Sequence, residues 1–224
     1  WVLLEAPDYV FIPEGTSNQF IEVARATVAK NYPGKLSSNS DYTSMINDRQ
    51  LHRVNGLLED AREKGAEVIA LADAEDARSA GKLAPHLVLN VSEDMQIMKE
   101  EIFGPLLPVK TYRGLDEVLE YINSHERPLA FYYFDDDRGR TEMMLKKTIS
   151  GGVSVNTVML HVLQENLPFG GVGNSGLGHY HAEEGFQTFS KMRPIFYQSK
   201  INGSALLRPP YGKLTRLLLK LTLR

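Results

Sequence analysis

The sequence predicts an α/β protein, a three-layer fold around a mainly parallel sheet. Short β-rich runs alternate with stretches in which apolar residues recur at helical spacing. Helices separate most of these runs, and such connections favour parallel strands. Of the 224 residues, 42% are hydrophobic and 24% are charged, which is ordinary for a globular chain with a substantial core.

The first half of the chain contains the clearest alternation. Pro13 ends the first β-rich run, and Pro33-Gly34 ends the first helical pattern. In the second helical pattern Leu51, Val54, Leu58 and Ala61 share one face, and Gly65 follows where a C-cap is expected. The expected elements are a strand at 8–13, a helix at 17–30, a polar loop at 36–44, a helix at 48–64, and strands at 67–71 and 86–91.

The second half continues the alternation as far as Asn156. We expect strands at 106–112, 129–134 and 153–156, with helices at 116–123 and 137–149. Beyond Asn156 glycines become frequent, a β-like run occupies 193–198, and the tail is basic. This change predicts three segments, namely a core at 1–156, a glycine-rich loop segment at 157–190, and a strand with its tail at 191–224.

Composition excludes several classes of function. A net charge of −3 gives no reason to expect nucleic-acid binding, which usually shows as a strongly basic face or domain. No apolar run reaches the roughly 18 residues that span a bilayer, and no secretory signal pattern is present. The chain has no cysteine, which excludes disulfides, thiolate metal sites and thiol catalysis within this polypeptide. A cytoplasmic location is expected by default.

Two motifs carry most of the functional information. One is Glu-Ile-Phe-Gly-Pro at 101–105, preceded by Glu100, and the other is Leu-Pro-Phe-Gly-Gly-Val-Gly-Asn-Ser-Gly at 167–176. In this order they resemble the aldehyde dehydrogenase superfamily, in particular its class 3-like and coniferyl aldehyde dehydrogenase branch. The resemblance extends from about Ala6 to about Phe196. It implies the catalytic-domain portion of an enzyme that oxidises aldehydes with NAD or NADP.

The resemblance also locates the nucleophile that the chain lacks. Ala6-Pro7-Asp8-Tyr9-Val10 is similar to the family segment just after the catalytic cysteine, which would fall at Leu4. Leucine has no lone pair with which to attack a carbonyl. The chain is therefore expected to be inactive alone, as a C-terminal piece with non-native first residues or as a degenerate homologue. The resemblance places the general base and the nucleotide-binding half upstream.

The first motif supplies the expected cofactor-binding residues. The resemblance implies that Glu101 holds the hydroxyls of the nicotinamide ribose and that Phe103 lies against the nicotinamide. A carboxylate accepts two hydroxyl hydrogen bonds well. The alternatives are that the glutamates form a solvated acidic turn and that Phe103 is a core aromatic.

The second motif and its neighbours supply the expected substrate pocket, namely Phe169, Asn156 and His161. The resemblance places Phe169 toward substrate and cofactor, Asn156 near the catalytic centre, and His161 in the pocket lining. Asn156 could equally be a turn former. The glycines of the loop indicate unusual backbone angles, not a dinucleotide fingerprint. His161, His179 and His181 lack the spacing of a metal site, so no metal is expected.

The tail at 208–224 contains five basic residues and no acidic one. Lys213, Arg216 and Lys220 share one helical stripe, and leucines lie on another face. Such a helix can lie on an anionic membrane, cover the substrate entrance or pack on another subunit. The resemblance implies a homodimer or homotetramer through 193–198. A non-catalytic binding or assembly module derived from the same fold is the competing function.

Overall fold

The computed structural model describes residues 6–201, 203, 209 and 211–222, and Leu4, the expected nucleophile position, lies outside them. The chain divides into two compact units, Trp1–Thr188 and Phe189–Arg224. Residues 157–188 therefore group with the core, and the basic tail belongs to the second unit.

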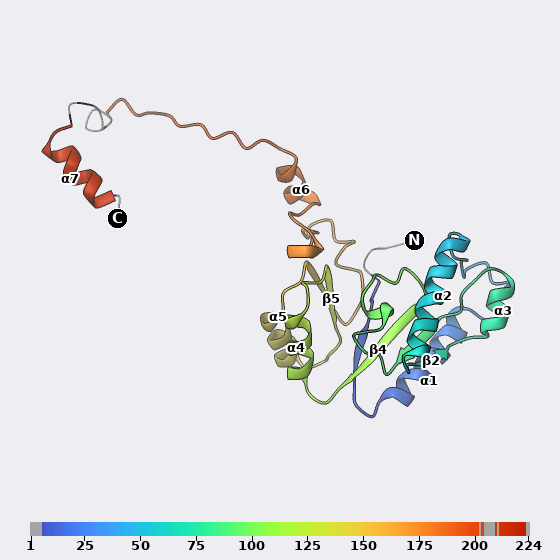
Figure 1. The fold of residues 1–224 in the computed structure, drawn as a ribbon. Helices are drawn as coiled ribbons and strands as arrows, with labels where there is room; N and C mark the ends of the chain where they lie inside the picture. Colours follow the sequence, from blue (N-terminus) through green and yellow to red (C-terminus); the bar gives the residue numbers. More distant parts are fainter. Residues whose placement is uncertain (1–5, 202, 204–208, 210, 223–224) are drawn as a thin grey trace. The chain divides into compact units, whose positions relative to one another are not determined.

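The first unit contains two sheets (Figure 1). In the larger sheet the order is β1 (Val10–Pro13), β4 (Leu106–Tyr112), β3 (His86–Leu89) and β2 (Glu67–Ala70). β4 pairs in parallel with both β1 and β3, whereas β2 is antiparallel to β3. The smaller sheet pairs β5 (Ala130–Tyr133) in parallel with β6 (Gly152–Val155). The expected mainly parallel α/β architecture is confirmed.

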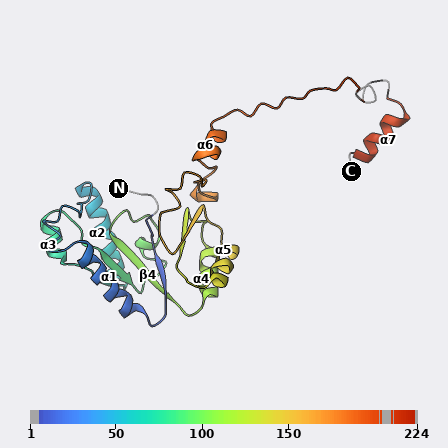
Figure 2. The ribbon, with the colours of Figure 1, turned by 180° about the vertical axis from the view of Figure 1, so that it is seen from behind.

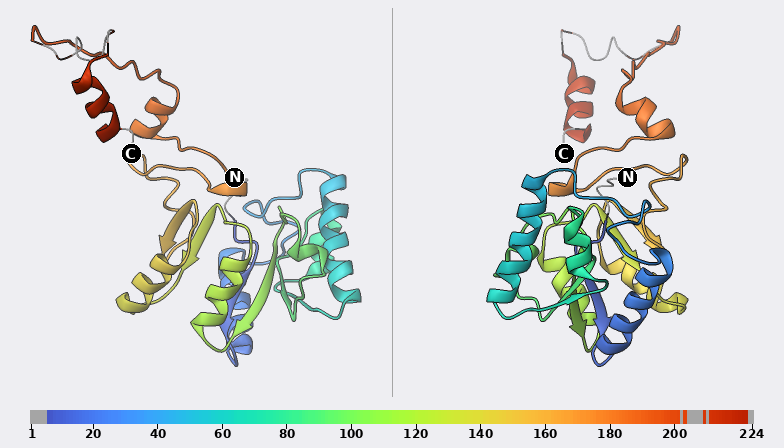
Figure 3. Two further views of the ribbon diagram at one scale, coloured as in Figure 1. Left: turned by 60° about the vertical axis from the view of Figure 1, so that its left-hand side comes forward. Right: turned by 90° about the vertical axis from the view of Figure 1, so that its right-hand side faces the viewer.

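Helices cover both faces of the larger sheet, as the views from behind and from the side show (Figures 2 and 3). On one face α2 (Asp48–Glu63) packs Val54, Leu57 and Leu58 around Val88. On the other, α1 (Ser17–Asn31) packs against Leu87 and Leu89. All four residues of β3 are buried, because alternate side chains enter opposite layers.

The smaller sheet has a separate apolar cluster. α4 (Leu115–Ser124) and α5 (Arg138–Lys147) bury Val118, Leu119, Ile122 and Met144 against Tyr133. The side chain of Asp137 caps α5 by accepting a 2.7 Å hydrogen bond from the Arg140 amide. Each strand expected before Asn156 is present, with ends shifted by up to two residues.

Two short helices were not expected, α3 (Ala74–Ser79) and α6 (Ala182–Thr188). Six or seven residues give too few turns for a periodic apolar pattern, although Asp73 caps α3 clearly. The expected strand at 193–198 was wrong for a single chain, since these residues form no strand. A strand requires a hydrogen-bonded neighbour, so the role of 193–198 in a subunit contact stays a prediction.

The second unit contains α7 (Lys213–Thr222), which confirms the expected helix in the tail. Phe189, Phe196 and Tyr197 are each at least 85% exposed, and five leucines of α7 are exposed as well. Over the part of the chain that the structure describes, no helix has both the length and the apolar character to cross a membrane.

Candidate functional site

A hollow of about 660 Å³ lies beside the Glu-Ile-Phe-Gly-Pro corner. Its walls come from the segments that lead into the parallel strands, because Asp8 precedes β1, Glu101 precedes β4 and Glu126 precedes β5. The lining is Asp8, Tyr9, Ile97, Met98, Lys99, Glu100, Glu101, Glu126, Leu129, Asn174 and Ser175. Open α/β sheets usually bind ligands at the carboxyl ends of their strands. This hollow instead lies at the amino ends of β1, β4 and β5.

Arg53 of α2 fastens the corner from behind. Its guanidinium donates hydrogen bonds to the carbonyls of Glu101, at 3.2 Å, and Ile102. It also lies 3.5 Å from the Glu100 carboxylate. The Ile102 side chain is buried, and its amide donates to Asp8 at 3.4 Å. These contacts leave the Glu101 side chain exposed at the hollow.

The backbone after Glu101 turns sharply. Phe103 has a φ of +46°, an unusual value for a residue with a side chain, and remains 43% exposed. At Gly104 an added Cβ would lie 2.7 Å from a methyl of the fully buried Val54. Glycine is therefore required there by close packing against α2. In the described chain Phe103 lies outside the lining of the hollow, and its role beside the nicotinamide stays a prediction.

The hollow is electrostatically negative. Four carboxyl groups line it, those of Asp8, Glu100, Glu101 and Glu126, together with the single lysine Lys99. Partial burial raises the pKa of Glu101, the nearby Asp8 raises it further, and Arg53 lowers it. Asp8 is exposed as a residue, but crowding desolvates its carboxyl group and raises its pKa despite the hydrogen bond from Ile102.

The Pro-Phe-Gly-Gly loop is held chiefly by its own backbone. Phe169 and Tyr180 exchange two amide-to-carbonyl hydrogen bonds, of 2.9 and 2.8 Å. An added Cβ at Gly170 would collide with the Gly178 carbonyl, and one at Gly171 would collide with Ser175 backbone. These glycines permit close backbone packing.

The structure brings Phe169 and His161 together. Their ring centroids are 6.5 Å apart, and the His161 Nδ1 lies 2.8 Å from the hydroxyl oxygen of buried Ser154 in β6. Desolvation lowers the pKa of His161, which favours the neutral ring. Tyr180 and His181 contact the other sides of Phe169. Placement of Phe169 and His161 in one cluster agrees with a shared pocket, and contact with substrate stays a prediction.

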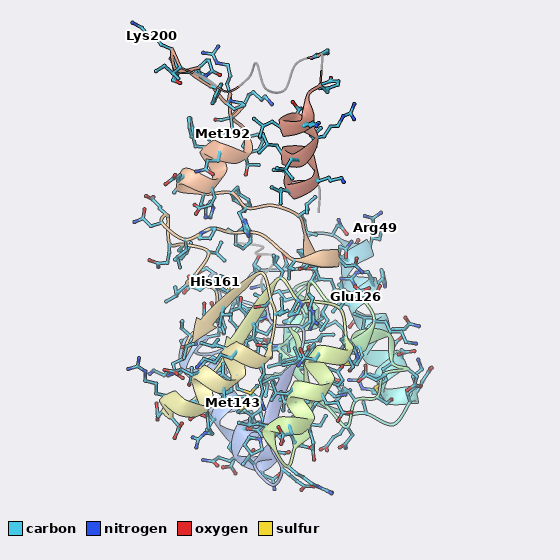
Figure 4. The ribbon with its side chains drawn as sticks, turned by 90° about the vertical axis from the view of Figure 1, so that its left-hand side faces the viewer. Arg49, Glu126, Met143, His161, Met192 and Lys200 are labelled. Atoms are coloured by element: carbon cyan, nitrogen blue, oxygen red, sulfur yellow. The ribbon has the colours of Figure 1, made fainter. Side chains whose placement is uncertain are left out.

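Asn174 joins the loop to the hollow. Its side-chain amide donates a 2.7 Å hydrogen bond to the Glu126 carboxylate. Next to it, the Ser175 hydroxyl accepts from the Val172 amide and donates to the Val172 carbonyl. Glu126 and His161 lie toward the same end of the core in Figure 4. Both motifs therefore contribute to one region, Glu101 directly and the loop through Asn174.

Asn156 occupies the carboxyl end of β6, the end opposite Gly151 and Gly152. Its side chain accepts from the Asp135 amide at 2.9 Å and donates to the Asp135 carbonyl at 3.1 Å. With a φ of +56°, it ends the strand as a turn former. The observed contacts are structural, and a substrate-pocket role for Asn156 stays a prediction.

Sequence reasoning missed the residues that support the site. Arg53 and Ser154 gave no local sequence signal. Arg53 contacts residues that are distant in the sequence, and Ser154 contacts a residue of the loop that follows it. Asp8 and Asn174 were within the recognised motifs but had no stated role. Glu126 is an unremarkable charged residue until folding places it beside Asn174.

Comparison with known proteins identifies the family to which this geometry belongs. The model of the aldehyde dehydrogenase family matches residues 6–195. The chain belongs to this family. Both motifs and the whole hollow lie within the matched range, so this aldehyde dehydrogenase segment carries the Glu101 corner and the Phe169 loop in their family context.

Two relatives and one solved structure show how much of an aldehyde dehydrogenase the chain represents. A probable coniferyl aldehyde dehydrogenase of Pseudomonas aeruginosa is 48% identical over 221 residues, 98% of this chain and 45% of the relative. A dimeric NADP-preferring aldehyde dehydrogenase of Canis lupus familiaris is 36% identical over 94% of this chain and 46% of its own length. The substrate-bound Staphylococcus aureus AldH structure has a TM-score of 0.82 at 30% identity, covering 99% of this chain and 47% of that one. The chain thus spans about half the length of these relatives.

Proposed function

We propose that this chain forms part of an NAD(P)-dependent aldehyde dehydrogenase that oxidises coniferyl aldehyde or another aromatic or medium-chain aldehyde to its acid. The supporting observation is the exposed Glu101 carboxylate at the rim of a hollow inside the region that matches the family. The name of the Pseudomonas relative supports coniferyl aldehyde as the first substrate to test. NAD and NADP both remain candidates, and the canine relative is named NADP-preferring.

The chemistry of the hollow fits the nicotinamide riboside end of such a cofactor. Ribose hydroxyls donate to carboxylates, and the oxidised nicotinamide ring is cationic, so four carboxyl groups suit that end and would repel its phosphates. The cofactor, when bound, accepts hydride from the substrate. Glu101 would hold the ribose hydroxyls, with Arg53 holding the backbone that carries it. Phe169 would supply an aromatic wall for the aldehyde, and neutral His161 would support that ring.

Restoring the nucleophile tests this function. The protein for this test is a chimera, the P. aeruginosa relative with its matched 221 residues replaced by this chain. With Leu4 present, we expect no aldehyde-dependent NADH or NADPH formation. Leu4→Cys should create it, because a thiol at that position can attack the carbonyl. The intact relative is the positive control.

Two further variants of the Leu4→Cys chimera assign the site. Glu101→Gln should lower kcat/KM by roughly tenfold or more, since a neutral amide holds the hydroxyls less strongly. Glu126→Gln, in the same hollow, should have a smaller effect. A folded Leu4→Cys chimera that binds cofactor but oxidises no aldehyde would favour the non-catalytic binding or assembly module.

The second unit supports a proposal about partners. We infer that 193–198 joins a second subunit in a dimer or tetramer, because Phe196 and Tyr197 are more than 80% exposed in the single chain. Light scattering of the chimera should report at least a dimer, and Phe196→Asp with Tyr197→Asp should reduce its mass to that of one subunit.

For α7 we propose packing on protein in the assembled enzyme. Flotation of the chain with anionic vesicles would instead assign the helix to a membrane surface. A reducing cytoplasm is the proposed location, because a cysteine at position 4, where the resemblance places the nucleophile, would have to stay reduced.

A further inference from the structure

The two faces of the smaller sheet have different neighbours. Tyr133 of β5 lies on the face that α4 and α5 bury. Because side chains alternate along a strand, Tyr132 points to the other face, together with its pairing partner Ser154 of β6. Gly152 precedes Ser154 by two residues and therefore belongs to that same face. His161, from the segment after β6, contacts this face at all three positions.

Ser154 holds His161 with a single hydroxyl group. The residue is only 5% exposed, and a buried hydroxyl requires hydrogen-bond partners. Its oxygen accepts from the His161 amide at 3.3 Å and lies 2.8 Å from the ring atom Nδ1. Since the amide can only donate, the hydroxyl proton is available to Nδ1, and the proton of the neutral ring then lies on Nε2. One hydroxyl therefore orients both the backbone and the ring of His161.

Gly152 makes room for the same ring. A Cβ added at this position would lie 2.5 Å from the Nε2 atom of His161 and closer still to Cδ2. The ring thus occupies the space that the side chain of any other residue would need. Gly152 is a strand residue and is absent from the glycines with positive φ. Close packing, and not an unusual backbone angle, therefore requires glycine here.

The ring of His161 in turn supports Phe169. The two ring centroids are 6.5 Å apart. Phe169 has little freedom to follow a displaced neighbour, because its backbone is bonded to Tyr180 and the rings of Tyr180 and His181 also contact it. A shift of His161 away from β6 would therefore change the space beside Phe169.

The Ser154–His161 pair does not have the surroundings of a nucleophile and its base. Such a pair must be open to substrate. In the described part of the chain, Ser154 lines neither the Glu101 hollow nor the apolar cleft, of about 520 Å³, that separates β1 from β5. Ser154 is also buried. Its effect on a substrate must therefore pass through His161.

We propose that Gly152 and Ser154 are positioning residues, which form a packing site for the His161 ring and thereby fix the Phe169 wall of the aldehyde pocket. The proposal rests on the aldehyde dehydrogenase function proposed above. A flat aromatic aldehyde such as coniferyl aldehyde can stack on an aromatic wall, whereas a short aliphatic aldehyde such as propanal makes few contacts with it. The packing site should therefore favour aromatic over short aliphatic aldehydes.

A double-mutant cycle in the chain itself tests the packing site without catalysis, so its failure is distinguishable from failure of the proposed enzyme function. Gly152→Ala should lower the urea midpoint of unfolding, because the added Cβ displaces His161. In a His161→Ala background the same change should have a much smaller effect, since the ring is gone. A Gly152→Ala chain that folds only when His161→Ala is added would support the packing site. Equal losses in both backgrounds, including failure of both to fold, would overturn it.

A matched pair of variants tests the Ser154 hydroxyl. Nitrogen NMR shifts of the imidazole report which ring nitrogen of His161 carries the proton, and the hydrogen bond at the other nitrogen sets this choice. Wild type should carry the proton on Nε2. Ser154→Ala should reduce the population of this tautomer, whereas Ser154→Thr keeps a hydroxyl and should retain it. An unchanged tautomer in Ser154→Ala would overturn the role of Ser154.

The effect on the pocket is tested in the Leu4→Cys chimera, by the ratio of kcat/KM for coniferyl aldehyde to kcat/KM for propanal. Gly152→Ala should lower this ratio by roughly tenfold or more, and Ser154→Ala should lower it less. Gly56→Ala adds the same methyl group in open space and should leave the ratio unchanged.

An unchanged ratio would overturn the effect on specificity, because a purely structural role would lower both values equally. If the Gly152→Ala chimera fails to fold, Ser154→Ala, which adds no atom, decides the same question. If the Leu4→Cys chimera oxidises neither aldehyde, equilibrium dialysis of both aldehydes against the Leu4 chimera and its Gly152→Ala and Ser154→Ala variants gives the ratio from binding alone.

Discussion

The Glu101 corner and the Phe169 loop are both irregular segments, but they are held in different ways. The corner is fixed from outside by side chains of other elements, chiefly Arg53, Asp8 and Val54. The loop is fixed from within, by the Phe169–Tyr180 backbone bridge and by glycines that touch carbonyl oxygens.

This difference indicates which substitutions should destabilise each segment. Loss of a supporting side chain should loosen the corner, while its own surface residues tolerate change. In the loop, added atoms are more damaging than lost ones, because backbone lies where a Cβ would go. The following predictions test this contrast.

The largest effect is expected for Gly171→Ala. The added Cβ would overlap the Ser175 backbone, which cannot move as a flexible side chain could. We expect a cost of about 3 kcal/mol to loop stability and fast exchange of the Phe169 and Tyr180 amides. Hydrogen exchange measures this change. Gly56→Ala is the control, since Gly56 lies in α2 with open space around it, and alanine should stabilise the chain by about 0.5–1 kcal/mol there.

Arg53→Ala should have the next largest effect. It leaves two corner carbonyls without their charged donor, one of them on buried Ile102. A loss of about 2 kcal/mol in the free energy of unfolding is expected, measured by urea denaturation. Arg53→Lys keeps the charge but not the forked geometry, so it should recover part of the loss. An unchanged midpoint for Arg53→Ala would show that the corner is held by its own backbone.

Asn174→Ala should produce a smaller change. The hydrogen bond to Glu126 is exposed, so its loss should cost about 0.5–1 kcal/mol. Exchange at 173–175 should rise while the Phe169–Tyr180 bridge stays protected. Glu126→Ala removes the other partner and should give the same result. Loss of the bridge in either variant would contradict the view that the loop is internally fixed.

The smallest effect concerns the charge of the corner. Asp8 raises the pKa of Glu101, so Asp8→Asn should move the Glu101 pKa downward, toward its ordinary value. Carboxyl resonances followed by NMR titration measure this shift. Glu126→Gln, which lines the same hollow, should leave the Glu101 pKa nearly unchanged.

The same substitution has a defined effect on stability. The pKa of Asp8 is higher in the folded state than its ordinary value of 3.8. A raised carboxyl pKa stabilises the fold below the ordinary value and loses that contribution as pH rises through the folded value. Wild type should therefore lose stability relative to Asp8→Asn over that rise. The opposite trend would show that the hydrogen bond from Ile102 outweighs desolvation.

Much of the fold was predictable because its signals are local. The apolar face of α2, the proline after β1 and the glycine after α2 each act within a few residues. The short helices α3 and α6 escaped notice because one or two turns contain too few periodic positions. The antiparallel direction of β2 depends on pairing with β3, which no local pattern encodes.

In the candidate site too, some features follow from local sequence motifs and others depend on residues distant in the chain. The chemical types needed at Glu101, Phe169 and the glycines were evident from two motifs in order. Their supports were not, since Arg53 is 48 residues from Glu101 and Glu126 is 48 residues from Asn174. Asn156 shows the converse, a residue singled out by resemblance whose observed bonds are to the nearby turn.

The sequence by itself determined the alternation of strands and helices, the family likeness and the absence of a thiol, because these depend on residue type and spacing. Only the tertiary structure decided that the hollow lies at the amino-terminal edge of the strands, that Asp8 and Glu101 line it together, and that a cleft separates β1 from β5. Those relations arise when segments far apart in the chain pack together. The charge of the hollow and the strand edges at the cleft result from this packing, because no single segment contains them.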